Sequence, residues 1–110
     1  MSHAADVKES CFPVLLDKER TLKYDLNSFI ELEELYGSIE GALKEMEKGT
    51  GQMKAVRAVS WAGLLHEDPS LTVKSVGAML NLRNLDAVSQ TLLAAIEAAL
   101  PKGTDTKNPL

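Results

Sequence analysis

The sequence predicts an α+β domain that is mainly α, with an N-terminal β-hairpin packed on a bundle of about five short helices. Apolar side chains recur at helical spacing through most of residues 25–100. Nearer the N-terminus, two short apolar runs flank a charged tetrapeptide, which is typical of a hairpin. We expect residues 11–100 to form this single domain, between a flexible arm at 1–10 and a disordered tail at 101–110.

The hairpin is predicted over residues 11–24. Residues 11–16 (CFPVLL) are apolar, residues 17–20 (DKER) are placed in the turn, and Leu22 and Tyr24 alternate with polar neighbours. Pro13 is expected at an edge or a strand start, where its missing N–H costs least. Because a lone hairpin is not stable, its apolar face is expected to lie against the helices.

The first helices are placed by their capping residues. Asp25 is expected to cap a helix that ends at Gly37, and Ser38 a second helix that ends at Gly49. A longer apolar helix is predicted over residues 52–66.

The C-terminal helices follow a turn at Asp68-Pro69. Thr72 is expected to cap a short helix that reaches Leu80, and residues 81–84 form a turn. The last helix is predicted over residues 85–100, with a core-facing stripe of Leu85, Val88, Leu92, Ile96 and Leu100.

Composition excludes several classes of function. A length of 110 residues fits one domain. The net charge of −4 argues against nucleic acid and against an anionic membrane surface, because both require clustered Lys and Arg. The single cysteine, Cys11, indicates a reducing compartment. No signal-peptide or membrane-spanning run is visible, so the protein is expected to stay where it is made.

Catalytic and ligand-binding motifs are also missing from the pattern. His66 and Cys11 stand apart from other metal-ligating side chains, and Ser60 lacks the context of a nucleophile. A solvated helix face explains the acidic side chains Glu31, Glu33, Glu34, Glu40, Glu45 and Glu47. We therefore expect a protein that is not an enzyme and has no metal or cofactor site.

One candidate partner-binding face lies on the 52–66 helix. It places the aromatic side chain of Trp61 beside basic groups, an arrangement typical of interface hot spots. Its residues are Met53, Lys54, Arg57, Trp61 and Leu64. The alternative is that Trp61 is simply the largest core side chain.

A second candidate face lies on the last helix, where Ala87, Ala94, Ala95 and Ala98 carry few charges between them. Such a face suits self-association or a partner. The alternative is plain helix propensity, since alanine is the best helix former.

Several motifs occur in a recognisable order. They are residues 20–39 (RTLKYDLNSFIELEELYGSI), 61–66 (WAGLLH) and 68–72 (DPSLT), followed by Val73 and Val76-Gly77. Together they resemble the tail assembly chaperones of long-tailed bacteriophages and prophages. The resemblance covers roughly residues 12–100, and its motifs are structural rather than catalytic.

The resemblance implies a role in phage tail assembly. Such chaperones bind the long, helical tape-measure protein in the cytoplasm of the bacterial host and keep it soluble while tail-tube subunits polymerise. They are absent from the mature virion. They tend to form homo-oligomers, and a longer frameshifted form binds the tail-tube subunit. This chain has no long C-terminal extension, so the resemblance implies the short form and leaves tube binding open.

Two alternatives remain at this stage. A small structural virion component, such as a head–tail connector or completion protein, shares the size and acidity and would be found in purified particles. A regulatory domain of helix-turn-helix type would use a recognition helix over residues 74–83, although basic residues are sparse there.

Overall fold

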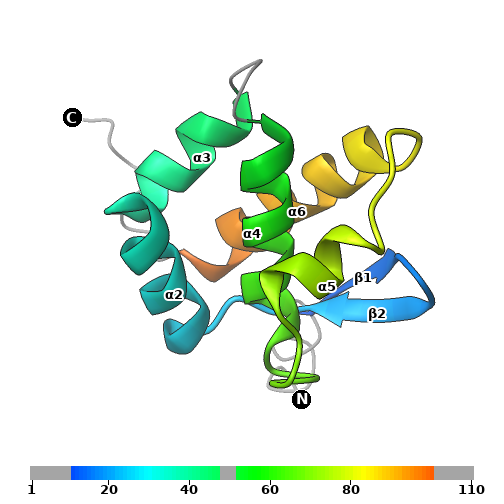
Figure 1. Cartoon of the computed structure of the whole chain (residues 1–110). Helices are drawn as coiled ribbons and strands as arrows, with labels where there is room; N and C mark the ends of the chain where they lie inside the picture. Colours follow the sequence, from blue (N-terminus) through cyan, green and yellow to red (C-terminus); the bar gives the residue numbers. More distant parts are fainter. Residues whose placement is uncertain (1–10, 48–51, 101–110) are drawn as a thin grey trace.

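The computed structural model describes residues 11–47 and 52–100, and its elements confirm the predicted fold class (Figure 1). The hairpin and helices are β1 (Phe12–Leu15), β2 (Glu19–Leu22), α2 (Leu26–Tyr36), α3 (Ile39–Glu47), α4 (Gln52–Leu64), α5 (Val73–Gly77) and α6 (Leu85–Ala99). The predicted arm, the predicted tail and the expected stop at Gly49 lie outside the described residues.

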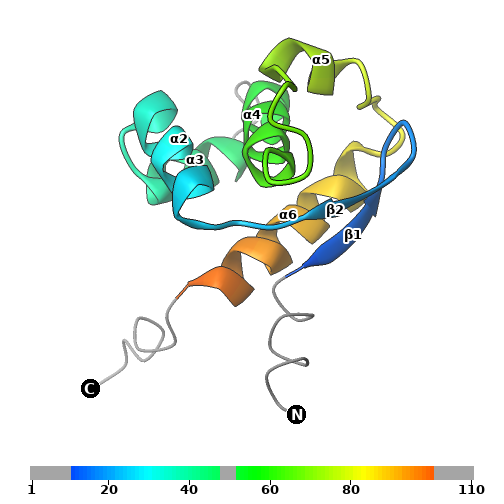
Figure 2. The same ribbon diagram turned by 90° about the horizontal axis from the view of Figure 1, so that it is seen from below.

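Helix α4 is the centre of the molecule. Figures 1 and 2 show α5 and α6 on opposite sides of it, with α2 and α3 along a third side. Small side chains make this enclosure possible, because they let neighbouring backbones approach closely. The buried small residues of α4 are Ala55, Ala58, Ser60, Ala62 and Gly63.

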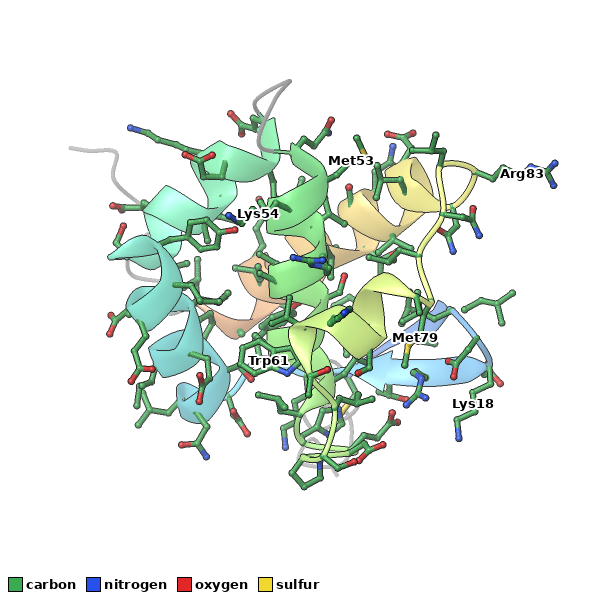
Figure 3. The ribbon with its side chains drawn as sticks, viewed as in Figure 1. Lys18, Met53, Lys54, Trp61, Met79 and Arg83 are labelled. Atoms are coloured by element: carbon green, nitrogen blue, oxygen red, sulfur yellow. The ribbon has the colours of Figure 1, made fainter. Side chains whose placement is uncertain are left out.

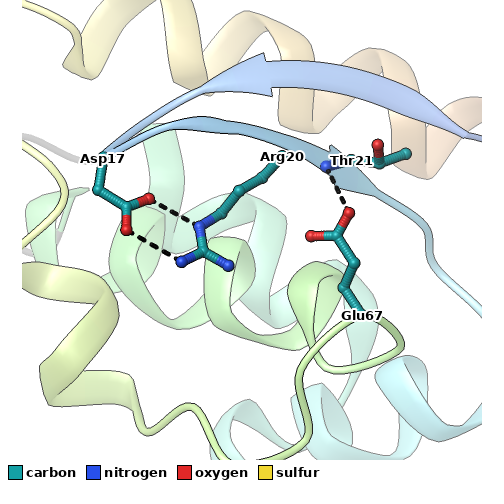
Figure 4. Close-up of polar contacts among 4 residues, drawn as sticks. All are labelled: Asp17, Arg20, Thr21 and Glu67. Atoms are coloured by element: carbon teal, nitrogen blue, oxygen red, sulfur yellow. Dashed lines mark hydrogen bonds and ion pairs between the residues drawn. The ribbon is translucent and has the colours of Figure 1, made fainter.

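The hairpin turn is shorter than predicted. β2 begins at Glu19, so the turn covers residues 16–18 and not 17–20. The prediction was wrong because it treated Arg20 as a solvated turn residue. Arg20 is instead only 8% exposed, and its Nε and one Nη donate to the two carboxylate oxygens of Asp17 at 2.7 and 3.0 Å (Figure 4). Because its charge is paired with Asp17, the Arg20 side chain can be buried in a strand at a small cost in folding free energy.

The outer edge of β2 is docked on the end of α4. The N–H of Thr21 donates to Oε2 of Glu67 at 3.2 Å, and its carbonyl lies 2.8 Å from Nε2 of His66. Both backbone groups of Thr21 therefore point away from β1. Thr21 pairs with Pro13, so the nitrogen of Pro13 also points outward. The proline thus lies at an open edge, as the sequence predicted.

The predicted helix caps are confirmed. Asp25 and Ser28 form a reciprocal capping box, and Gly37 ends α2 at a φ of 81°. The hydroxyl of Ser38 accepts from the N–H of Gly41 at 2.9 Å at the start of α3. Thr72 forms a second capping box at the start of α5. Each of these signals is local, so the sequence alone is enough to find it.

Two helices end earlier than predicted. Helix α4 stops at Leu64 rather than residue 66, because the N–H groups of both Glu67 and Asp68 turn back to the Leu64 carbonyl. Helix α5 stops at Gly77 rather than Leu80. The chain then continues in tight turns, in which each N–H bonds to the carbonyl three residues earlier.

The core joins the hairpin to the helices in one cluster. Its fully buried large side chains include Leu22 of β2, Leu32 of α2 and Leu92 of α6. The predicted α6 stripe is confirmed at Val88, Leu92 and Ile96, with its two ends half-buried. None of the helices in the described part of the chain has the length and apolarity needed to cross a bilayer.

Candidate partner-binding groove

One groove beside α4 is lined by three of the residues that were predicted to bind a partner. Met53, Lys54 and Arg57 lie on the N-terminal half of this helix, and Figure 3 shows Met53 and Lys54 at the end away from the hairpin. The opposite wall consists of α5 and of the residues at 80–85 that lead into α6. The groove has a volume of about 560 Å³, which is within the range of ligand-binding clefts.

The groove is cationic. Lys54, Arg57 and Lys74 line it, and no Asp or Glu of the described residues does. None of these three side chains forms an ion pair with a carboxylate in residues 11–47 and 52–100. Within the same residues, Nε of Arg57 is buried and has no hydrogen-bond partner. A protein of net charge −4 therefore carries a locally positive surface here.

Apolar side chains accompany these cations. Leu82 is 77% exposed and Met53 is 57% exposed, both high values for large apolar side chains. Leu80 and Leu85 are half-buried and pack against the core from the floor of the groove. The groove therefore offers apolar contact and positive charge to the same ligand.

Gly77 lets the Arg57 side chain lie across α5. A Cβ at Gly77 would be 2.7 Å from Cδ of Arg57, well inside the normal carbon–carbon contact of about 3.5 Å. The aliphatic part of Arg57 therefore packs on the glycine, and its charged end stays beside the groove.

A second hollow adjoins the first. It has a volume of about 350 Å³, and its lining includes Leu35 and Tyr36 of α2 together with Lys54 and Arg57. The pKa of Tyr36 is raised mainly by burial and further by the charge of Glu45, whereas Arg57 lowers it. Lys54 and Arg57 therefore line both hollows.

Trp61 and Leu64 do not belong to the groove. Leu64 is fully buried, so its prediction as a partner contact is wrong. Near Leu64 the helix is enclosed by neighbouring elements on almost every side. A helical wheel shows which residues share a face, but not that several faces are buried. Trp61 is half-buried, and its indole N–H donates to the Leu71 carbonyl at 2.9 Å. Trp61 therefore fixes the segment between α4 and α5, although one side still lines a shallow hollow with Pro69.

The predicted alanine face of α6 lies apart from the groove. Ala87, Ala94 and Ala98 are exposed as expected, whereas Ala95 is buried. Ala94 and Ala98 line a shallow hollow that also includes Phe12 of β1. The two predicted partner-binding faces are therefore two separate surfaces.

Three other groups with shifted pKa values form contacts within the fold. The Arg20 guanidinium lowers the pKa of Asp17 to about 2, and two hydrogen bonds from Ser70 lower the pKa of Asp68. Burial raises the pKa of Tyr24, whose hydroxyl donates to the Val59 carbonyl at 2.6 Å. Among the described residues, no three His, Cys, Asp or Glu side chains are grouped to hold a metal ion.

The second wall of the groove was not predicted from the sequence. It includes Lys74, Leu80, Leu82 and Leu85, none of which was among the residues predicted to bind a protein partner. The spacing of Lys54 and Arg57 places both on one helix face, but only the packing of α5 on α4 brings Lys74 to them.

Comparisons with known proteins identified no relative of this chain. No protein-family model, no curated protein and no solved structure matches this chain.

Proposed function

We propose that this protein is a non-enzymatic tail assembly chaperone of a long-tailed phage or prophage. In this proposal it binds the tape-measure protein in the host cytoplasm, keeps it soluble during tail assembly and is left out of the mature virion. The observation that carries the proposal is the ordered set of motifs in residues 20–39, 61–66 and 68–72.

The packing of these motifs supports the proposal. The indole N–H of Trp61 in the second motif donates to the carbonyl of Leu71 in the third. Gly63 in the second motif receives the Tyr24 ring of the first, since a Cβ there would be 2.6 Å from Cζ of Tyr24. Because these motifs pack on one another, the residue types in one motif limit those that fit in the next. The three motifs therefore belong to one packed structure.

The exposed surfaces suit a protein that covers another chain. The groove and the α6 alanine face can each remove apolar surface from water, at about 25 cal/mol per Å². Copies joined in a homo-oligomer would bind one long partner more tightly than a single copy, because each further contact is then intramolecular. Weak individual contacts would still let the copies leave as tube subunits polymerise.

The helix-turn-helix alternative loses its basis. It required a recognition helix over residues 74–83, but α5 ends at Gly77 and the residues from 78 to 84 are not helical. The structural virion component remains the competing function. It differs from the chaperone in one observable, the presence of the chain in purified particles.

Co-expression with the tape-measure protein tests the proposal. We expect the tape-measure protein to move from the insoluble to the soluble fraction and to co-purify with this chain. A matched culture that expresses an unrelated acidic helical protein controls for a general effect of co-expression. If the tape-measure protein stays insoluble, and the chain is instead found in purified particles, the chaperone proposal is wrong and the structural one is favoured.

A further inference from the structure

We propose that the groove between α4 and α5 binds an amphipathic helix whose polar face carries carboxylates. In the chaperone this ligand would be an acidic helical segment of the tape-measure protein, and in that respect the inference rests on the proposed function. The chemistry of the groove itself is argued from the structure alone.

Charge complementarity selects the polar face of the ligand. Lys54, Arg57 and Lys74 come from two elements and converge on one groove, which no described carboxylate lines. Like charges held together without counter-charges repel one another, so an anionic ligand relieves this repulsion. Beside the exposed Lys54 and Lys74, the buried Nε of Arg57 has no hydrogen-bond partner among the described residues.

The apolar side chains select the other face of the ligand. Leu82 and Met53 are mostly exposed at the rim, and Leu80 and Leu85 form an apolar floor. Phosphate groups of a nucleic acid would satisfy the cations and leave these side chains in water. An amphipathic helix satisfies both, because its apolar side chains fill the groove and its carboxylates reach the cationic walls.

A helical ligand is favoured over one that adds a strand to the hairpin, because the edges of β1 and β2 offer few free backbone groups. On the outer edge of β2, Glu67 and His66 already bond to the N–H and carbonyl of Thr21. On β1, Pro13 has no N–H to offer at the outward position. Addition of a partner strand would meet few free groups on either side, so the helical groove is the better site.

A designed peptide tests the groove without the tape-measure protein. The peptide is about 18 residues long, long enough to favour a helix, with leucine on one face and glutamate on the other. A second peptide has lysine in place of glutamate. We expect the intact protein to bind the glutamate peptide in fluorescence anisotropy, more weakly as salt is added, and to bind the lysine peptide far less.

Two pairs of variants locate the binding. Lys54→Glu with Lys74→Glu should weaken the glutamate peptide about tenfold or more, because two attractive charges become repulsive. The control is Lys18→Glu with Lys44→Glu, which makes the same change in net charge at exposed sites outside the groove and should leave binding unchanged. All four side chains are exposed, so folding is expected to survive.

The second pair tests the apolar contact. Leu82→Ser should weaken the glutamate peptide, whereas Leu26→Ser should not. Leu82 and Leu26 are 77% and 73% exposed, so neither change removes core packing.

Several results would overturn the inference. One is equal binding of both peptides, and another is equal loss in the groove and control variants. A third is binding of an oligonucleotide with no binding of the glutamate peptide, which would assign the groove to nucleic acid. A fourth is a dimer in sedimentation that only the groove variants dissociate, which would assign it to a second copy.

The proposed function can fail separately. If the glutamate peptide binds through the groove but co-expressed tape-measure protein stays insoluble, the groove chemistry is supported and the chaperone proposal fails. If the tape-measure protein is solubilised equally by the wild type and by Lys54→Glu with Lys74→Glu, the chaperone proposal survives and the assignment of the groove to the tape-measure protein is wrong.

Discussion

Gly63→Ala should destabilise the protein even though alanine is the better helix former. A Cβ at this position of α4 would lie 2.6 Å from Cζ of Tyr24, 2.7 Å from its hydroxyl oxygen and 2.9 Å from a methyl carbon of Leu22. Ordinary contact is about 3.5 Å, so the Tyr24 ring would have to move by roughly 0.9 Å. The ring is 5% exposed and its hydroxyl is bonded to the Val59 carbonyl, so there is little room to move.

The expected cost follows from three contributions. Overpacking of a filled core costs about 1–3 kcal/mol, and weakening the hydrogen bond of Tyr24 costs about 1 kcal/mol more. Replacing a helical glycine by alanine returns about 1 kcal/mol. We therefore expect Gly63→Ala to lower the free energy of unfolding by about 1–3 kcal/mol, measured by urea denaturation with circular dichroism.

Two further variants isolate the clash. A Cβ at Gly77 would be too close to one atom only, Cδ of the flexible Arg57 side chain, so Gly77→Ala should cost less. In a Tyr24→Leu background most of the clashing atoms are gone, so Gly63→Ala should cost less there than in the wild type. A Gly63→Ala protein as stable as the wild type, or a cost that is the same in both backgrounds, would refute the packing argument.

Three more predictions concern single polar groups. Ser60 is fully buried and its hydroxyl has no partner among the described residues, so Ser60→Ala should raise the free energy of unfolding by about 1 kcal/mol in urea denaturation. Tyr24→Phe should lower it by about 1 kcal/mol, because a backbone carbonyl of α4 loses its buried donor. The Arg20 guanidinium lowers the pKa of Asp17 from 3.8 to about 2, so this ion pair stabilises the fold above about pH 3.8 and is lost as the pH falls through about 2. Acid titration followed by circular dichroism should therefore show the wild-type advantage over Asp17→Asn shrinking across that interval, and an advantage that does not change would contradict it.

Local chemistry made much of the fold predictable. Asp25 and Thr72 form their caps within three residues of chain, and Gly37 adopts the left-handed conformation at the end of its helix. The alternation of Leu22 and Tyr24 correctly predicted two buried side chains, although β2 ends at Leu22 and Tyr24 lies just beyond it.

Features that depend on tertiary packing were not predictable. Arg20 lies in a strand because Asp17 neutralises it, and Leu64 is buried because neighbouring elements enclose α4. The groove needs Lys74 beside Lys54, residues that are adjacent only after α5 packs on α4. Periodicity within a single helix has no information on such contacts.

The chaperone function is tested most directly with purified components. Tape-measure protein is diluted from denaturant into buffer that contains increasing amounts of this chain, and aggregation is followed by light scattering. We expect scattering to fall as the chain is added and to reach a plateau when the partner is fully covered. Scattering that stays equal to that with an unrelated acidic helical protein would contradict the chaperone function.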